Sequence, residues 1–216
     1  MKRSLKKMVF VEPKSTHLHI YSRVCIPRLG SVLLGTIMRA KGFDVRVFIE
    51  DIQAIDMAEL HSADLVAVSA ITSTAPQSYK LADMMRAAGK VVVMGGTHTS
   101  FMPEEGMQHA DFIVRGEGEF AFQELVEAIQ RGEGFDKIQN LTYRDDSGRV
   151  ISNPERPKIK ASFNDAIHTF FAIANLPQAN YEDSPVEGCC SERFDRAGQM
   201  KKKQSPLPKP PPLSPR

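Results

Sequence analysis

Two short apolar runs that end abruptly in glycine constrain the fold of this 216-residue chain more than any other feature. The run at residues 91–94 leads directly into the glycine pair 95–96, and the run at residues 111–114 is soon followed by Gly-Glu-Gly at 116–118. Apolar, β-branched runs without polar alternation are typical of strands buried on both faces of a parallel sheet. Because such sheets bind ligands beyond the carboxyl ends of their strands, we predict a ligand across these two glycine turns.

Strand patterns alternate with helical patterns through the first part of the chain. Further strands are expected at residues 8–12, 44–49 and 64–69, and helices at residues 29–41, 75–88, 103–109 and 119–130, with a short one near 57–60. This alternation predicts a right-handed parallel α/β sheet of flavodoxin-like (Rossmann-like), doubly wound type with five strands. A C-terminal β-hairpin is expected within residues 141–151, around an Asp/Gly turn.

Three regions follow from these patterns. Residues 1–135 are expected to form the α/β domain, residues 136–158 a β-hairpin and linker, and residues 159–216 an atypical tail rich in proline and lysine. A helix is conceivable at residues 161–174, but the end of the chain cannot bury a core and is expected to be disordered. A truncated or frame-shifted reading frame would explain the abrupt change, and a genuine tail that recruits a partner through Pro-x-x-Pro is the alternative.

Composition excludes several classes of function. The net charge of +2 argues against a nucleic-acid partner, and no apolar run is long enough to span a membrane. The three cysteines, Cys25, Cys189 and Cys190, have neither a metal-binding spacing nor an even disulfide framework, so a reducing cytoplasm is the expected compartment.

The common nucleotide motifs are missing. Neither Gly-x-Gly-x-x-Gly nor the phosphate-binding Gly-x4-Gly-Lys-Ser/Thr is found, and only residues 14–16 faintly resemble a flavin phosphate loop. The third expected strand ends in Ser69, where a phospho-receiver needs aspartate. With the two glycine turns, Ser69 places small side chains at the ends of three neighbouring strands. These would leave a deep slot, suited to a long ligand arm inserted against the sheet.

Several motifs in this order resemble one family. They are Arg-Leu-Gly at 28–30, Ser-x-Ile at 69–71, Gly-Gly-Thr-His at 95–98, Pro-Glu-Glu at 103–105, His-Ala-Asp at 109–111, and Val-Arg-Gly-Glu-Gly-Glu at 114–119. Over residues 8–157 the chain is similar to the N-terminal cobalamin (B12)-binding domain of radical S-adenosylmethionine (SAM) proteins. The resemblance implies a base-off cobalamin, with its nucleotide tail in the slot and its corrin over the strand ends. The implied contacts are Leu29, Gly30, Ser69, Ile71, Thr72, Gly95, Gly96, Thr97, His98, Gly116, Glu117 and Gly118.

Two departures from the family limit what is implied. The Asp-x-His-x-x-Gly motif that supplies a cobalt ligand in the methionine-synthase type is missing, and His17 and His19 are more simply solvated loop residues than ligands. The Cys-x3-Cys-x2-Cys motif is missing as well, so an iron–sulfur cluster, SAM and a radical SAM catalytic domain are expected only in a full-length relative. We therefore predict a cobalamin-binding domain that has no catalytic residue or metal ligand of its own. A flavodoxin-like flavin protein and a cofactor-free interaction module are the alternatives.

Overall fold

The computed structural model describes residues 2–15 and 29–157, which contain a single sheet in the order β2-β1-β3-β4-β5-β6-β7. The strands are β1 (Lys7–Glu12), β2 (Asp44–Ile49), β3 (Leu65–Ser69), β4 (Val91–Gly95), β5 (Phe112–Val114), β6 (Leu141–Arg144) and β7 (Val150–Ser152). Strands β1 to β5 pair in parallel, which confirms the predicted flavodoxin-like type. The sheet has seven strands and not the predicted five, because β6 and β7 join it. The expected helix at 161–174, the disordered tail, His17, His19 and the three cysteines lie outside the described residues.

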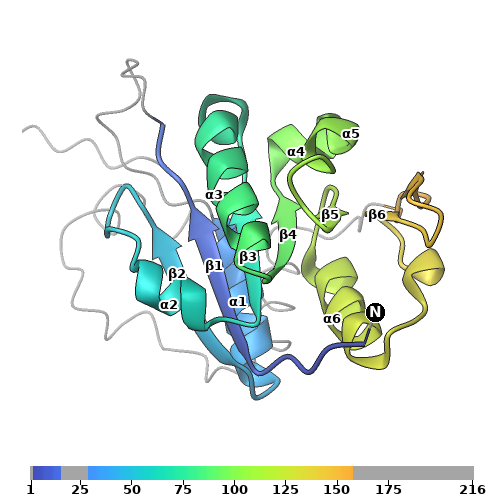
Figure 1. Ribbon diagram of the computed structural model, residues 1–216, viewed down its shortest axis with the longest axis horizontal. Helices are drawn as coiled ribbons and strands as arrows, with labels where there is room; N and C mark the ends of the chain where they lie inside the picture. The colour runs from blue at the N-terminus through green and yellow to red at the C-terminus, as the bar shows by residue number, and fades with distance from the viewer. Residues whose placement is uncertain (1, 16–28, 158–216) are drawn as a thin grey trace, which may run out of the picture. The chain divides into compact units, whose positions relative to one another are not determined.

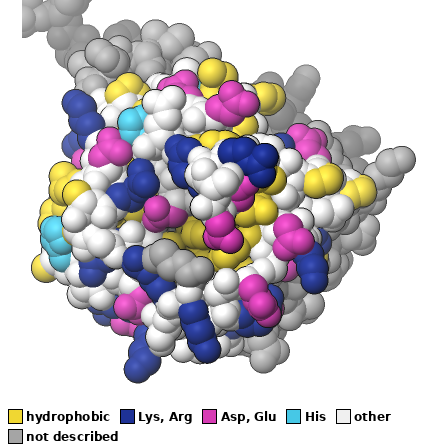
Figure 2. Space-filling model, turned by 45° about the vertical axis from the view of Figure 1, so that its right-hand side comes forward, with side chains coloured by type: hydrophobic (Ala, Val, Ile, Leu, Met, Phe, Trp, Pro, Cys, Tyr) yellow, Lys and Arg dark blue, Asp and Glu magenta, His cyan; other side chains and the backbone are white. Residues whose placement is uncertain are grey.

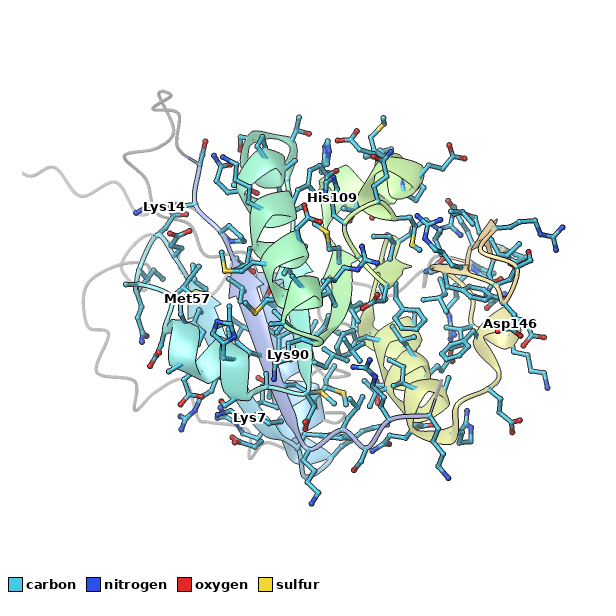
Figure 3. All side chains as sticks on the ribbon, in the orientation of Figure 1. Lys7, Lys14, Met57, Lys90, His109 and Asp146 are labelled. Carbon is cyan, nitrogen blue, oxygen red and sulfur yellow. The ribbon has the colours of Figure 1, made fainter. Side chains whose placement is uncertain are left out.

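The helices lie close to their predicted positions. They are α1 (Leu29–Ala40), α2 (Met57–Ser62), α3 (Ala75–Ala87), α4 (Thr97–Phe101), α5 (Pro103–Gly106) and α6 (Glu119–Arg131), with 3-10 turns η1 (Thr72–Thr74) and η2 (Phe135–Lys137). The sequence patterns did not predict α4, η1 or η2. Figure 3 shows Lys7 and Lys14, near the two ends of β1, on opposite sides of the sheet along the strand direction. The carboxyl ends of the parallel strands therefore lie on the side of Lys14, which we call the carboxyl edge, and their amino ends lie at the amino edge.

Each face of the sheet packs against helices, and the two faces have separate hydrophobic cores. On β1, Met8 and Phe10 belong to the core that contains α1 and α6, whereas Val9 and Val11 belong to the core that contains α2 and α3. Figure 1 shows α2 and α3 on the near side of β1 and β3, and α1 on the far side. Successive side chains of a strand point to opposite faces. A strand covered by helices on both faces must therefore be apolar at every position.

Helix α1 packs unusually close to the sheet. A Cβ added at Gly35 would lie 2.8 Å from Val47 Cγ2 and 3.4 Å from Val45 Cγ1, both on β2. Gly35 is buried in the middle of α1, so it allows the helix backbone to approach β2 closely. This approach fixes where the first turn of α1 lies above the carboxyl edge.

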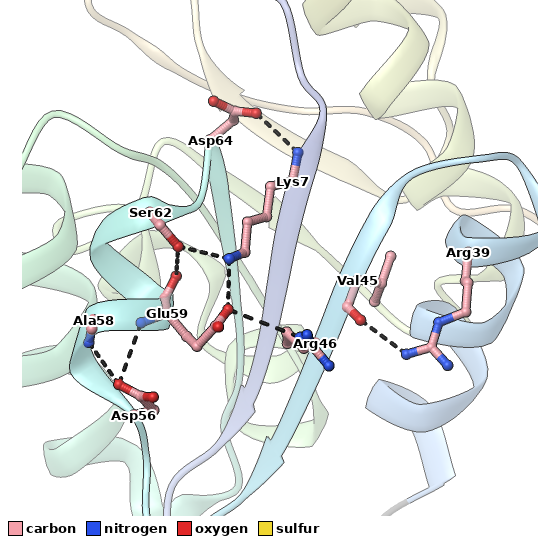
Figure 4. Close-up of polar contacts among 9 residues, drawn as sticks. All are labelled: Lys7, Arg39, Val45, Arg46, Asp56, Ala58, Glu59, Ser62 and Asp64. Carbon is pink, nitrogen blue, oxygen red and sulfur yellow. Dashed lines mark hydrogen bonds and ion pairs between the residues drawn. The ribbon is translucent and has the colours of Figure 1, made fainter.

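Polar contacts join the amino edge of the sheet (Figure 4). The Lys7 ammonium lies 2.6 Å from Glu59 and donates to Ser62 at 2.7 Å, and the Asp64 carboxylate accepts from the Lys7 main-chain N–H at 2.9 Å. Asp56 caps α2 through the N–H groups of its first turn. Partly exposed ion pairs contribute little to stability. The main role of these contacts is therefore to position α2 beside β1.

The predicted hairpin forms and extends the main sheet. Strand β6 pairs antiparallel with β5, where Phe112 lies opposite Tyr143, and β7 pairs antiparallel with β6. The ring of Phe135 in η2 contacts both Phe112 and Tyr143, at centroid distances of 5.2 and 5.9 Å. The hairpin therefore covers the edge that the short strand β5 would otherwise expose.

Candidate cofactor site

A slot of about 280 Å³ opens at the carboxyl ends of β3, β4 and β5, on the face that α1 and α6 cover. The lining strand residues include Ala67 and Ser69 of β3 and Val93 and Gly95 of β4. Their spacing of two follows from the alternation of side chains along a strand. Apolar side chains predominate in the lining, whose members are Phe10, Gly30, Ser31, Leu34, Ala67, Val68, Ser69, Val93, Met94, Gly95, Gly96, Val114, Gly116, Glu117, Gly118, Glu119 and Phe122.

Two glycines of the slot leave room that a side chain would fill. A Cβ at Gly95 would meet only Val114 O, at 3.4 Å, and a Cβ at Gly118 would lie 3.4 Å from Val114 Cγ1 and 3.5 Å from Leu34. Neither glycine has a positive φ. Backbone conformation therefore does not require glycine at either position, and the missing side chains keep the slot open.

Gly96 has a different role, because its backbone conformation excludes other residues. Its φ of 93° and ψ of 177° lie in a region that is essentially restricted to glycine. A Cβ there would lie 2.5 Å from Ala70 O and 3.1 Å from Ser69 Oγ. The adjacent main chain is also joined to Ala70, which donates to Gly95 O at 2.8 Å and accepts from His98 N at 3.1 Å. The turns after β3 and β4 thus lie in direct contact.

Ser100 joins the two glycine turns, a role that the sequence analysis did not predict. Its hydroxyl donates to Gly96 O at 2.8 Å and accepts from Gly116 N at 2.9 Å. The contact exists because residues 97–101 form the helix α4, which places Ser100 one turn after Gly96. A serine four residues after a glycine turn was the available signal, since a helical serine often bonds to the carbonyl four residues before it.

Five of the twelve predicted contact residues do not line the slot. They are Leu29, Ile71, Thr72, Thr97 and His98. Leu29 begins α1 with 78% of its surface exposed. Thr72 and Thr97 are exposed and Ile71 is half-buried, all just after the carboxyl ends of β3 and β4. His98 Nδ1 lies 3.3 Å from Thr72 Oγ1. The seven that the structure brings together are Gly30, Ser69, Gly95, Gly96, Gly116, Glu117 and Gly118.

The His98 imidazole lies in a polar cluster beside α3. Its Nε2 is 3.7 Å from the Glu105 carboxylate, and its ring centroid is 6.0 Å from that of Tyr79. Burial raises the pKa of the Tyr79 hydroxyl, and the nearby Glu105 carboxylate raises it further. Tyr79 also stacks on His109 with ring centroids 4.2 Å apart. Tyr79 therefore remains protonated over the physiological pH range.

Two helices begin at the slot. Gly30 and Ser31 in the first turn of α1, and Gly118 and Glu119 at the start of α6, all contribute to its lining. Unpaired N–H groups at a helix N-terminus favour an anion. Among residues 2–15 and 29–157, no group of three or more His, Cys, Asp or Glu side chains could hold a metal ion.

A second cavity, of about 470 Å³, lies at the amino ends of β4 and β5. Val91, Phe112, Phe135 and Tyr143 contribute apolar side chains to it, and Asp146 lies at its hairpin side. Figure 2 brings that side of the molecule forward and shows apolar side chains in a hollow surrounded by acidic and basic ones. Because this cavity lies away from the carboxyl edge, it is separate from the slot.

The fold and the slot define a class. An open parallel α/β sheet with a narrow slot at its carboxyl edge is typical of cofactor-binding domains. The sequence model of the B12-binding domain matches residues 18–126, about half of the chain. The chain therefore belongs to the B12-binding domain family, as the sequence motifs predicted. Within the described residues, no helix is both long and apolar enough to cross a membrane.

Two curated relatives that are named as methyltransferases are much longer than this chain. An uncharacterized methyltransferase of Pyrococcus horikoshii is 34% identical over 145 residues, which cover 62% of this chain and 31% of that protein. Bacteriochlorophyllide d C-12(1)-methyltransferase of Chlorobaculum tepidum is 30% identical over 132 residues, which cover 61% of this chain and 29% of that protein. The chain thus spans less than a third of the length of these relatives.

Solved structures of cobalamin-dependent radical SAM enzymes share the fold. OxsB with aqua-cobalamin bound superposes with a TM-score of 0.56 and 19% identity, over 71% of this chain and 23% of that one. TsrM from Kitasatospora setae, with cobalamin and a 4Fe–4S cluster bound, gives a TM-score of 0.53 and 20% identity, over 74% of this chain and 31% of that one. These likenesses show that the fold is shared, over less than a third of each enzyme.

Proposed function

We propose that this domain binds cobalamin base-off, with the nucleotide arm inserted in the slot and the corrin above the carboxyl ends of β3, β4 and β5. The size of the slot is the observation that carries the proposal. At about 280 Å³ it lies at the lower limit of ordinary ligand pockets, which measure about 300–1,000 Å³. It would accommodate one arm of a large cofactor and leave the macrocycle outside. An arm buried there is held away from the cobalt, which is the base-off arrangement.

The chemistry of the lining suits such an arm. Phe10, Val93 and Phe122 offer an apolar surface to an aromatic base, and the Ser69 side chain offers a hydroxyl. The first turns of α1 and α6 present N–H groups where the phosphate of the arm would enter. When bound, cobalamin supplies organometallic or radical chemistry that protein side chains lack. The slot residues would hold and orient it.

The activity of a complete enzyme extends beyond this domain. We propose that the domain works with a radical SAM catalytic domain, because the structural neighbours OxsB and TsrM are radical SAM enzymes. The iron–sulfur cluster and SAM belong to such full-length relatives. A cytoplasmic location and the lack of nucleic-acid and membrane partners stay predictions from the sequence.

Titrating the purified chain with hydroxocobalamin tests the cofactor, and cobinamide, which lacks the nucleotide arm, tests the mode of binding. We expect a changed visible spectrum with hydroxocobalamin, much weaker binding of cobinamide, and no binding of flavin mononucleotide. After reduction to the cobalt(II) form, electron paramagnetic resonance should lack the nitrogen splitting of a coordinated base. No binding of hydroxocobalamin at about 50 μM, which corresponds to less than about 6 kcal/mol of binding free energy, would refute the proposal. Equal affinities for the two ligands would refute the insertion of the arm.

Replacing Ser100 with alanine should weaken hydroxocobalamin binding several-fold and leave the fold intact. The variant loses the hydroxyl that joins Gly96 O to Gly116 N, and one such hydrogen bond contributes about 0.5–1.5 kcal/mol. Absorbance titration measures the affinity, and circular dichroism checks the fold. The control is Ser147→Ala, which removes a hydroxyl from the exposed hairpin turn. Unchanged affinity in the Ser100 variant would show that the hydroxyl does not hold the two turns in place.

A further inference from the structure

Asn140, in the loop before β6, has an unusual backbone conformation. Its φ is 66°, and no other non-glycine residue of the described chain has a positive φ. It is also buried, with 7% of its surface exposed. Asparagine tolerates the left-handed region better than most residues, although the conformation is still uncommon for it. A strained, buried asparagine points to contacts that fix it in place.

The hydrogen bonds of Asn140 link two segments that are distant in sequence. Its main-chain carbonyl accepts from Arg115 N at 2.8 Å, and its Nδ2 lies 3.5 Å from Glu117 O. On the other side, its main-chain N–H donates to Pro154 O at 2.9 Å, and its Oδ1 accepts from Arg156 N at 2.8 Å. One residue thus connects the glycine turn that lines the slot with residues 153–156, which we call the exit segment.

The exit segment is also anchored to α6, the helix that begins at the slot. The Arg156 guanidinium donates to both oxygens of Glu124, at 2.7 and 2.8 Å, and lies 5.2 Å from the centroid of the Phe120 ring. The Asn153 side chain donates to two main-chain carbonyls of the η2 region, and its carbonyl accepts from the Arg115 guanidinium. The Arg156 contacts hold the exit segment against the same helix whose first turn lines the slot.

We propose that Asn140 is a positioning residue of the cofactor slot, and that it makes the turn at 116–118 and the exit segment one cooperative unit. The proposal rests on cobalamin being the ligand of the slot. Binding in the slot then stabilises the exit segment, and the anchored exit segment strengthens binding by the same factor, because coupling between two sites is reciprocal. Residues 153–156 are therefore held in a position that the bound cofactor reinforces.

The variant Asn140→Gly tests the coupling, because glycine keeps the left-handed backbone and removes both amide atoms. Hydrogen exchange measured by mass spectrometry should be faster at residues 116–118 and 153–157 of the ligand-free variant than in the unaltered chain. Hydroxocobalamin should slow exchange at residues 153–157 of the unaltered chain and not of the variant. The dissociation constant should rise about 5-fold or more, the lower limit of typical coupling. A purely structural role would not abolish the ligand-dependent protection.

Two further variants complete the experiment. Glu124→Gln weakens the anchor of Arg156 without altering Asn140. It should reduce in part the protection from exchange that hydroxocobalamin gives residues 153–157. It therefore tests the coupling even if Asn140→Gly fails to fold. Asp146→Gly, at the hairpin turn, should behave as the unaltered chain. If the unaltered chain binds hydroxocobalamin and both Asn140→Gly and Glu124→Gln keep its affinity and protection, the coupling is refuted and the proposed function stands. If the unaltered chain does not bind, the proposed function fails and the coupling to cobalamin fails with it.

Discussion

Replacing Gly96 with alanine is expected to abolish cobalamin binding and to lower the free energy of unfolding by about 3 kcal/mol or more. Two costs combine in this variant. The backbone at φ 93° and ψ 177° lies in a region that alanine avoids, at a cost of about 1–3 kcal/mol. The new Cβ would also lie 2.5 Å from Ala70 O and 2.9 Å from Ala70 N. Because both atoms belong to the backbone, the turn after β3 must move, and it forms part of the slot.

A second glycine with a similar φ isolates the steric cost of the contact with Ala70. Gly42 has a φ of 92°, and a Cβ added there would have no heavy atom within 4 Å, so Gly42→Ala bears only the conformational cost. Urea unfolding of both variants gives the difference, and absorbance titration with hydroxocobalamin gives the affinities. We expect Gly42→Ala to bind normally and to be the more stable of the two. If Gly96→Ala and Gly42→Ala had equal stability and equal affinity, the close contact between Gly96 and Ala70 would not be needed for folding or for binding.

The sequence predicted the parallel sheet because its signal is local. Strands β1, β3, β4 and β5 are dominated by short apolar runs, because both faces of the sheet are buried there. Strand β2, at the edge of the sheet, alternates at its start instead. The glycine turns were also predictable, since glycine directly after a buried strand marks a sharp turn or a close approach. These features need no knowledge of which residues meet across the fold.

The contacts that complete the slot were not predictable, because they join residues that are distant in sequence. Ser100 meets Gly116 across 16 residues, and Asn140 meets Glu117 across 23. His98 was predicted as a cofactor contact on the basis of its place in the motif, and its proximity to Tyr79 could not be predicted because it depends on the unpredicted helix α4. The hairpin was predicted from its turn, but its pairing with β5 depends on Phe112 and Tyr143 lying opposite each other.

Replacing Gly95 with valine should abolish cobalamin binding and preserve the fold. Gly95 lies in β4 two residues after Val93, so its side chain would point into the slot. Its φ is not positive, and an added Cβ would meet only Val114 O, at an ordinary 3.4 Å. Valine is also favoured in strands. The two methyl groups would then occupy the space that we assign to the nucleotide arm.

We expect the affinity of Gly95→Val for hydroxocobalamin to fall at least about 100-fold, or about 2.7 kcal/mol, with an unfolding midpoint close to that of the unaltered chain. Gly95→Ala adds a single carbon and should give an intermediate loss. The affinity for cobinamide, which has no arm to insert, should change much less. Comparing the two ligands distinguishes a blocked slot from a distorted corrin surface. A blocked slot weakens hydroxocobalamin binding far more than cobinamide binding, whereas a distorted corrin surface weakens both. A folded Gly95→Val variant that binds hydroxocobalamin normally would place the nucleotide arm outside the slot.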